Sequence, residues 1–549
     1  MTRHQTYRRA RSPGACTALA LLLVTAGGCS GGPTPGDAAT VNFLIESSPT
    51  SLDPRIGTDA QSEHLDGLIF DSLLAHDAQM NTVPDLAERW EEPDSLTYVF
   101  HLRRGVRFHD GRALTSADVK FTFDSILSGA VKSPKRQAFG MVRSIEMPDK
   151  DTVVFHLHEP YASFLWNLMR PGLGIVPKGS GTEAAQRPIG TGPFRFVSMA
   201  PDEEIVLERN PSYFGDALPV ASAKAEVASA SFAVAQNSPA PPRSDPKARP
   251  IERVRFRIVP DALVRALELR KGTGDLAINS LTPDMAEALA KQPGIASDEQ
   301  AGTTLAYIAF NFEDPILAHR EVRQALVHAT DRATLIKYLL RGKAQPASSL
   351  LPPNHWAYEP NVMQYGYDLA RAEQLLDSAG FRRGADGMRF TVTLKTSTEE
   401  STRLLGEALA DQWKRIGVAL KLRPLEFATF YSDITHGSFQ LYTFRWIGAN
   451  RDPDIFEYVF SSKKMPPQGA NRGHYRNAAL DVLLDQEHVE MDREKRKVIL
   501  SQIQKIVAED EPYINLWYPD NVCVHRVRLT DIVIPPSGDY EFLNGARLQ

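Results

Sequence analysis

The chain has 549 residues, which is too many for one hydrophobic core, so two or three domains are expected. Charged residues make up 23% and hydrophobic residues 42%, as in ordinary soluble globular proteins. The formal net charge of -5 gives no electrostatic footprint for nucleic acid, which disfavours a DNA-binding function.

The N-terminus predicts a targeting segment. Four arginines within residues 3–11 form a basic region, and residues 15–24 form an apolar run too short to span a bilayer as a mature helix. The run ends in TAGGC, which resembles a lipobox with Ala26 in place of the usual leucine. This predicts residues 1–28 as a signal peptide and Cys29 as the lipidated first residue. An ordinary signal peptide cleaved nearby is the alternative, and both interpretations predict export.

The three cysteines indicate neither a disulfide nor a cysteine metal site. Cys16 would be removed with the signal peptide, and Cys29 would carry the lipid. Cys523 lies in an alternating, strand-like run, where a small buried hydrophobic residue is expected. Residues 29–40 are rich in Gly and Pro and are predicted to be a flexible tether between membrane and protein. We expect no metal and no cofactor.

The first elements after the tether are a strand and a helix. The run VNFLIESSPTSLDP, which starts at Val41, predicts a strand followed by a turn at Asp53-Pro54. Phe70 lies on a probable helix. Next, residues 96–102 predict a half-buried strand, because Tyr98, Phe100 and Leu102 fall on one face.

A turn, a second strand and a helix are predicted to follow. Gly105 can supply a positive φ in the turn, and residues 106–108 are predicted to return as the second strand of a hairpin. Asp110-Gly111 is a strong signal for another tight turn. Thr115 or Ser116 is then expected to cap a helix. The predicted order is strand, turn, strand, turn, capped helix.

The run VPDLAERWEEPDSLTYVFHLRRGVRFHDGRALTSADVKFTFDSIL closely resembles the signature region of the family 5 extracellular solute-binding proteins, the oligopeptide and dipeptide receptors of ABC importers (cluster C). The pattern P-x-LAe-x-W, TytF-x-LR-x-GV-x-F-h-dG and ltadDV is matched from Pro84 through Val119. The resemblance implies an α/β fold of the periplasmic-binding-protein type II class. Two lobes joined by a two-strand hinge are expected, with a small αβ domain inserted in the first lobe.

The resemblance also implies a division of the chain. The first lobe is expected to contain residues 41–76, 189–300 and 514–549, the accessory αβ domain residues 77–188, and the second lobe residues 301–513. Residues 219–250 depart from the family and are rich in Ala, Ser and Pro, so a disordered insertion is predicted. Closure is expected at strands near Ala309 and Tyr513.

The predicted ligand site follows the strand at residues 439–444. Residues 446–454 resemble the family's W-x-g-D-x-x-D-P-d cleft loop. In peptide-binding members the Asp after the Gly pairs with the ammonium group of the peptide, but this chain has Ala449 there. The ligand is therefore not expected to be a short peptide held by its free N-terminus, and an acidic, neutral or blocked solute is predicted. Further along, Asn471, Tyr475 and Asn477 resemble the family's N-x-x-x-Y-x-N run.

Trp446 is the foremost predicted ligand residue, because a Trp on a cleft loop offers a large flat face to varied ligands. The alternative is a Trp buried in the core of the lobe. Arg445 flanks the loop at one end, and Asn450 and Arg451 lie within it. From the first lobe, Phe70 and Asp53 are predicted to meet the ligand. For Phe70, a core position on a helix is the alternative.

The sequence predicts no enzyme, because it has no G-x-S-x-G, H-E-x-x-H or C-x-x-C motif. The predicted function is that of a substrate-binding lipoprotein, a monomer that captures a peptide or peptide-like solute between its lobes and delivers it to ABC permease and ATPase subunits. The lipid anchor would be its membrane contact, in the periplasm or at the cell surface. The alternative is an exported binding or signalling lipoprotein without a dedicated transporter.

Overall fold

The computed structural model describes residues 39–77, 80–169, 173–217, 248–448 and 452–549. The predicted signal peptide, Cys29 and residues 30–38 of the tether lie outside these residues, as does most of the predicted insertion. Within the described ranges, no helix combines the length and the apolar composition needed to cross a bilayer.

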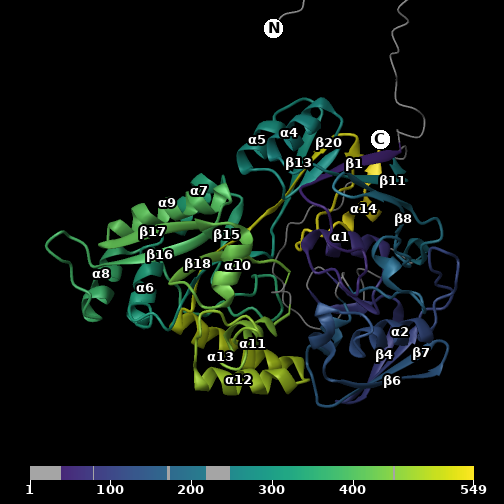
Figure 1. Ribbon diagram of the computed structural model, residues 1–549, viewed down its shortest axis with the longest axis horizontal. Helices are drawn as coiled ribbons and strands as arrows, with labels where there is room; N and C mark the ends of the chain where they lie inside the picture. Colours follow the sequence, from purple (N-terminus) through teal and green to yellow (C-terminus); the bar gives the residue numbers. More distant parts are fainter. Residues whose placement is uncertain (1–38, 78–79, 170–172, 218–247, 449–451) are drawn as a thin grey trace, which may run out of the picture. The chain divides into compact units, whose positions relative to one another are not determined.

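The first sheet has seven strands in the order β13-β20-β12-β1-β11-β9-β8. Figure 1 labels β13, β20, β1, β11 and β8 of this sheet. β1 runs parallel to β11 and β12, and the other pairs are antiparallel. The strands are β1 (Thr40–Ile45), β8 (Phe194–Ala200), β9 (Glu204–Arg209), β11 (Arg253–Ile258), β12 (Leu276–Ile278), β13 (Ile295–Gln300) and β20 (Asn521–Arg526).

Alternating side chains of β1 divide between two cores, as the two-residue period of a strand requires. Val41, Phe43 and Ile45 belong to a core that includes residues of α1 (Ala60–Ile69). Leu44 points to the opposite face and packs with residues of α4 (Ala262–Lys271) and α5 (Pro283–Ala290). The sheet is therefore covered on both faces.

A second, antiparallel sheet has the order β4-β5-β7-β6 and packs against α2. These elements are β4 (Ala87–Asp94), β5 (Thr97–Leu102), β6 (Val142–Asp149), β7 (Thr152–Leu157) and α2 (Ser116–Leu127). Several local predictions are confirmed: Gly105 and Gly111 have positive φ, and Thr115 forms a capping box with Asp118 at the start of α2. The predicted return strand at 106–108 is wrong. β5 pairs with β4 and β7 instead, and Arg107 makes only an isolated bridge with Ala113.

The third large sheet has six strands in the order β15-β19-β14-β18-β16-β17. They are β14 (Leu305–Phe310), β15 (Ala344–Pro346), β16 (Phe390–Ser397), β17 (Val418–Leu425), β18 (Leu441–Trp446) and β19 (Tyr513–Pro519). β18 extends two residues beyond the predicted strand end, so Arg445 and Trp446 belong to the strand and not to the loop after it.

Two groups of helices cover the two faces of this sheet. One core contains residues of α6 (Arg320–His328), α7 (Arg332–Leu339), α8 (Leu369–Ser378) and α9 (Glu400–Lys414). The other contains residues of α10 (Phe427–Thr435), α11 (Ile455–Phe460), α12 (Ala478–Val489) and α13 (Arg493–Asp510). Asp331 accepts a hydrogen bond from the backbone N–H of Thr334 at the start of α7, so it caps this helix as predicted.

Two short connections join the seven-stranded and six-stranded sheets. Residues 301–304 link β13 to β14, and residue 520 links β19 to β20. The predicted boundary between residues 513 and 514 falls at the start of β19, which pairs with β14 and β15 in the six-stranded sheet. The remaining α-helices and strands are β2 (Leu74–His76), β3 (Thr82–Pro84), α3 (Phe164–Asn167), β10 (Arg249–Pro250), β21 (Leu529–Thr530), α14 (Phe542–Gly545) and β22 (Arg547–Leu548).

Candidate functional site

Four aromatic side chains gather on the face of the six-stranded sheet that α10 to α13 cover. Tyr307 comes from β14, Tyr442 and Trp446 from β18, and Tyr513 from β19. The ring of Tyr307 stacks on Trp446 with centroids 5.9 Å apart, and on Tyr513 with centroids 4.3 Å apart. All four are buried, and we call them the aromatic wall.

Arg472 lies against the aromatic wall. Its guanidinium carbon is 5.5 Å from the ring centroids of both Trp446 and Tyr431, and the residue is only 6% exposed. Among the described residues, it makes no ion pair with a carboxylate. Nη1 is buried and without an acceptor, as are Nε1 of Trp446 and the hydroxyls of Tyr307 and Tyr442. A buried cation thus faces several polar groups that make no hydrogen bond.

The position of Arg472 is fixed by its neighbours in the chain. The Asn471 side chain donates to the carbonyls of Ser461 at 3.0 Å and Tyr475 at 2.8 Å. The carbonyl of Gly473 accepts a hydrogen bond from the N–H of Phe312 at 2.8 Å. A Cβ atom at position 473 would lie 2.3 Å from the carbonyl oxygen of Phe310, so glycine is required for this close approach.

Arg472 is charged at neutral pH. Burial opposes its charged form, but the nearby hydroxyls of Tyr442, Tyr307 and Tyr513 raise its pKa above the usual value. Burial also raises the pKa of Tyr307 and Tyr513, so these hydroxyls stay neutral and supply no counter-charge. Cation–π contacts contribute about 0.5–2 kcal/mol each, whereas burying an unpaired charge costs several kcal/mol. The aromatic rings alone do not offset the burial of this cation.

Exposed apolar side chains border Arg472 and Trp446. Phe427 and Tyr431 on α10 stack on one another, and Tyr458 on α11 contacts the ring of Trp446 edge-on at 6.3 Å. Phe427 is 54%, Tyr431 44%, Tyr458 45% and Ile447 59% exposed. We call these four residues the apolar rim. Exposed clusters of large apolar side chains mark ligand or partner sites more often than single ones do.

The residues predicted for the second lobe are only partly described. Trp446 is 8% exposed and packs in the aromatic wall, while Arg445 is exposed on the opposite face of β18, where it hydrogen-bonds Glu399 at 3.2 Å. Asn450 and Arg451 lie outside the described residues. The sequence interpretation passed over Arg472, although it lies inside the noted run from Asn471 to Asn477. Nothing in the sequence signals that this arginine is buried without a partner.

Phe70 is a core residue at the C-terminal end of α1. It is 3% exposed and belongs to the core beneath the seven-stranded sheet. Gly174 and Gly190 approach it so closely that a Cβ atom at position 174 would lie 2.0 Å from the Cβ of Phe70. Phe70 therefore occupies the position that the alternative interpretation expects, and its predicted contact with a ligand stays a prediction.

Asp53 is fully buried and paired with Arg55, which is equally buried. Nη2 of Arg55 donates to Oδ2 of Asp53 at 2.7 Å, and Nε donates to Oδ1 at 2.9 Å. The backbone N–H of Arg55 donates to the same Oδ1 at 3.0 Å. Both carboxylate oxygens are thus occupied within the fold, which favours a structural role for Asp53 over a contact with solute.

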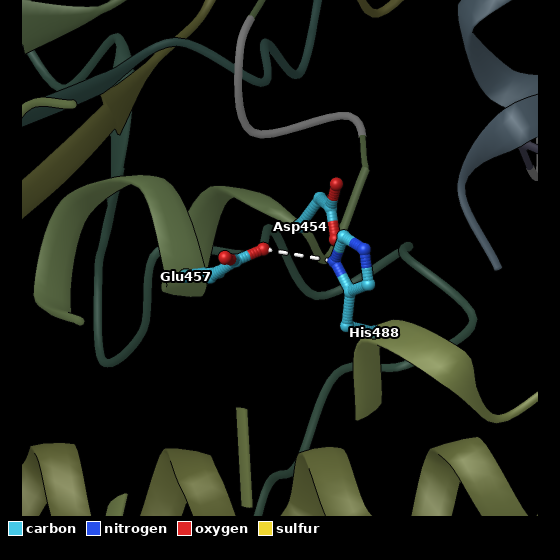
Figure 2. A group of neighbouring side chains, drawn as sticks. All are labelled: Asp454, Glu457 and His488. Carbon is cyan, nitrogen blue, oxygen red and sulfur yellow. Dashed lines mark hydrogen bonds and ion pairs between the residues drawn. The ribbon is translucent and has the colours of Figure 1, made fainter. Parts of the chain in front are cut away.

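Three polar side chains with ligand atoms suited to a metal lie together at Asp454, Glu457 and His488 (Figure 2). Nδ1 of His488 is 3.0 Å from Oε2 of Glu457, whose Oε1 is 3.1 Å from Nζ of Lys464. Burial would raise the pKa of Glu457, but these partners lower it, and the hydrogen bond to Glu457 raises the pKa of His488. This arrangement is an ion-pair cluster within the protein, which disfavours the metal interpretation.

The same region contacts the loop at residues 161–163, which precedes α3. The Tyr161 hydroxyl donates to Asp454 at 2.5 Å, and the Ser163 hydroxyl donates to Asp452 at 2.6 Å. Nη2 of Arg496 donates to the Ser163 hydroxyl at 2.7 Å, and its Nε donates to Glu487 at 2.6 Å. We call these contacts the polar latch.

The polar latch holds more carboxylates than cations. Asp452, Asp454 and Glu487 surround the single guanidinium of Arg496. Burial raises the pKa of Glu487 to about 8 against the attraction of Arg496, and burial together with the charge of Asp452 raises the pKa of Asp454 to about 6. At least one of the three carboxyl groups therefore keeps its proton near neutral pH.

The amino-acid sequence is similar to those of known solute-binding proteins. The family model described as bacterial extracellular solute-binding proteins, family 5 Middle, matches residues 81–466. Di/tripeptide-binding protein 1 of Pseudomonas aeruginosa is 28% identical, covering 90% of this chain and 92% of its own. Heme-binding protein A of Haemophilus influenzae is also 28% identical, covering 83% and 82%.

The fold is also similar to that of a solved structure. The periplasmic binding protein DppA from Helicobacter pylori, in complex with the peptide STSA, superposes with a TM-score of 0.73 at 27% identity. The match covers 93% of this chain and 98% of that one. The predicted fold class, a type II binding-protein fold with two lobes and an inserted αβ domain, is confirmed.

Replacing Asp53 by alanine is expected to destabilise the protein by about 3–5 kcal/mol, because the buried Arg55 loses its carboxylate partner. The free energy of unfolding in urea measures this loss. The matched control is Asp284→Ala, which breaks the exposed pair between Asp284 and Arg341 and should change stability little. Equal effects of the two substitutions would contradict the structural role of Asp53.

Raising the pH is expected to weaken the polar latch. The folded protein raises the pKa of Glu487 from 4.5 to about 8, so the stabilising proton is present below pH 4.5 and is lost as the pH rises towards 8. The melting temperature should therefore fall as the pH rises from about 4.5 to about 8 and change little above that. Glu487→Gln should flatten this fall, and Glu88→Gln, at an exposed position, should not. An unchanged slope in Glu487→Gln would refute the assignment.

Proposed function

Because the chain belongs to the bacterial extracellular solute-binding proteins of family 5, we propose that it is the substrate-binding lipoprotein of an ABC importer. It captures a peptide or peptide-like solute between its lobes and delivers it to the permease and ATPase subunits. Members of this family are transport receptors and not enzymes. The observation that carries the proposal is the combination of aromatic wall, apolar rim and unpaired cation on one face of the six-stranded sheet.

Closure occurs by a hinge at the two connections between the large sheets, residues 301–304 and residue 520. The hinge is placed at these connections and not at the strands near Ala309 and Tyr513, because both residues are buried and paired inside the six-stranded sheet. Short connections between two independently packed sheets absorb a rotation with little loss of contact. A solute that touches both lobes stabilises the closed state.

The solute is peptide-like but is not held by a free amine. Named relatives bind di- and tripeptides or heme, so the family accepts chemically different solutes. Alanine at position 449 removes the carboxylate with which peptide-binding members pair the ammonium group. An ammonium group buried there would lack a counter-ion, at a cost of several kcal/mol. An acidic, neutral or N-blocked solute avoids this cost.

The protein is exported and acts as a monomer at the cell surface or in the periplasm. We propose that Cys29 carries the lipid that anchors it, with the residues up to 40 as tether. The family's extracellular location and the basic and apolar runs of the N-terminus support export. The permease and the ATPase are its protein partners, and nucleic acid is not.

Blocking the amine of a peptide probe should not weaken its binding. The protein should bind N-acetyl-Ala-Phe at least as tightly as Ala-Phe, because no carboxylate at position 449 rewards the free ammonium group. Isothermal titration calorimetry with both probes measures this. Mass spectrometry of solute released from the purified protein gives the natural ligand. Tight binding that requires the free amine would contradict the proposal.

A further inference from the structure

We propose that Arg472 binds a carboxylate of the transported solute, whose apolar part lies against the apolar rim at Phe427, Tyr431 and Tyr458. This inference rests on the proposed function as a solute receptor and names the chemistry that the second lobe recognises. The second lobe would then hold its solute by an anionic group of that solute.

The first argument is a comparison among the buried arginines. Arg55 pairs with a carboxylate, and so does Arg496. Arg323 donates to four backbone carbonyls at 2.6–3.2 Å, and Arg265 donates to three. Arg472 is as buried as these residues, yet among the described residues it pairs with no carboxylate and nothing accepts a hydrogen bond from its Nη1. The described residues supply partners for the other buried guanidinium groups and leave Nη1 of this one without an acceptor.

The second argument concerns the polar groups around Arg472. The Nε1 of Trp446 and the hydroxyls of Tyr307 and Tyr442 are also buried without hydrogen-bond partners. A guanidinium and an indole N–H can only donate, and a hydroxyl can donate as well. What such a group of donors lacks is an acceptor with several lone pairs. A carboxylate fits, because its two oxygens match the fork of a guanidinium.

The third argument is access. Arg472 and Trp446 are buried, but Tyr431 and Tyr458, which contact them, are about half exposed. The rings that contact Arg472 and Trp446 are therefore open to water, and the proposed route of the solute to the guanidinium passes beside them. Its apolar part would cover side chains that are otherwise open to water, including Phe427. The ligand class is therefore a carboxylate joined to an apolar or aromatic group.

The test uses the full-length protein and two N-acetylated probes without a free amine, N-acetyl-Ala-Phe and its C-terminal amide. The wild type should bind the acid at least about 10-fold more tightly than the amide, because only the acid pairs with Arg472. Arg472→Gln should remove this preference by weakening the acid alone. The matched control Arg476→Gln, an exposed arginine of the same segment, should retain the preference. Equal binding of acid and amide by the wild type, or a preference retained in Arg472→Gln, would overturn the proposal.

A third probe, 3-phenylpropionate, separates this inference from the proposed function. If neither peptide binds but 3-phenylpropionate binds the wild type and not Arg472→Gln, the anion site stands and the peptide-like solute is wrong. If peptides bind equally as acid and amide, the receptor function stands and the anion site is wrong. If none of the three probes binds, both are overturned.

Thermal melting without ligand distinguishes a binding residue from a structural one. Arg472→Met should melt no lower than the wild type, because it removes a buried cation that has no partner. Arg323→Met should melt several degrees lower, because the carbonyls that Arg323 satisfies lose their donor. A loss in Arg472→Met as large as that in Arg323→Met would assign Arg472 to the scaffold and refute the proposal.

Discussion

A charge buried in a protein interior must be accompanied by an opposite charge or by hydrogen-bond acceptors, and this constraint organises both lobes. In the first lobe, Asp53 forms an ion pair with Arg55. In the second lobe, backbone carbonyls accept hydrogen bonds from the guanidinium of Arg323. Arg472, beside the aromatic wall, departs from this rule: no described carboxylate pairs with it, and its Nη1 lacks an acceptor there. Natural proteins keep such costly arrangements mainly at sites of function, where a ligand supplies what the fold omits.

The need to balance buried charges also governs the contact between the loop at residues 161–163 and the residues around Arg496. The polar latch joins the loop at residues 161–163 to Asp452, Glu487 and Arg496, and it contains one cation among three carboxylates. Contacts of this kind are sensitive to their surroundings because a proton decides their net charge. Such contacts suit the proposed opening and closing of the lobes, because they are specific in geometry without being strongly stabilising.

Local features of the fold could be predicted from the sequence because short-range rules determine them. The positive φ of Gly111 follows from its place in a tight turn, and the capping of α2 by Thr115 follows from the spacing of Thr115 and Asp118. The pairing of β5 with β7 could not be predicted in this way, because the two strands are far apart in the chain. β4 directly precedes β5 in the chain, but most of its residues are polar and exposed, so it lacks the alternating hydrophobic pattern that predicts a strand.

The candidate site shows the same limit. The loss of the carboxylate at position 449 is visible in the sequence because the surrounding motif sets the expectation. Whether an arginine is paired depends on which residues meet in space, so Arg472 and Arg323 look alike until the fold is known. For Trp446, the pattern predicted a place on the cleft loop, whereas the extra length of β18 puts its ring in the aromatic wall.

The central claim is that the protein closes on a solute held between two lobes. Small-angle X-ray scattering of the purified protein, with and without the solute that co-purifies with it, tests this most directly. The account predicts a smaller radius of gyration in the presence of the solute, because the lobes rotate together about residues 301–304 and 520. An unchanged radius of gyration at a saturating concentration of solute would contradict it.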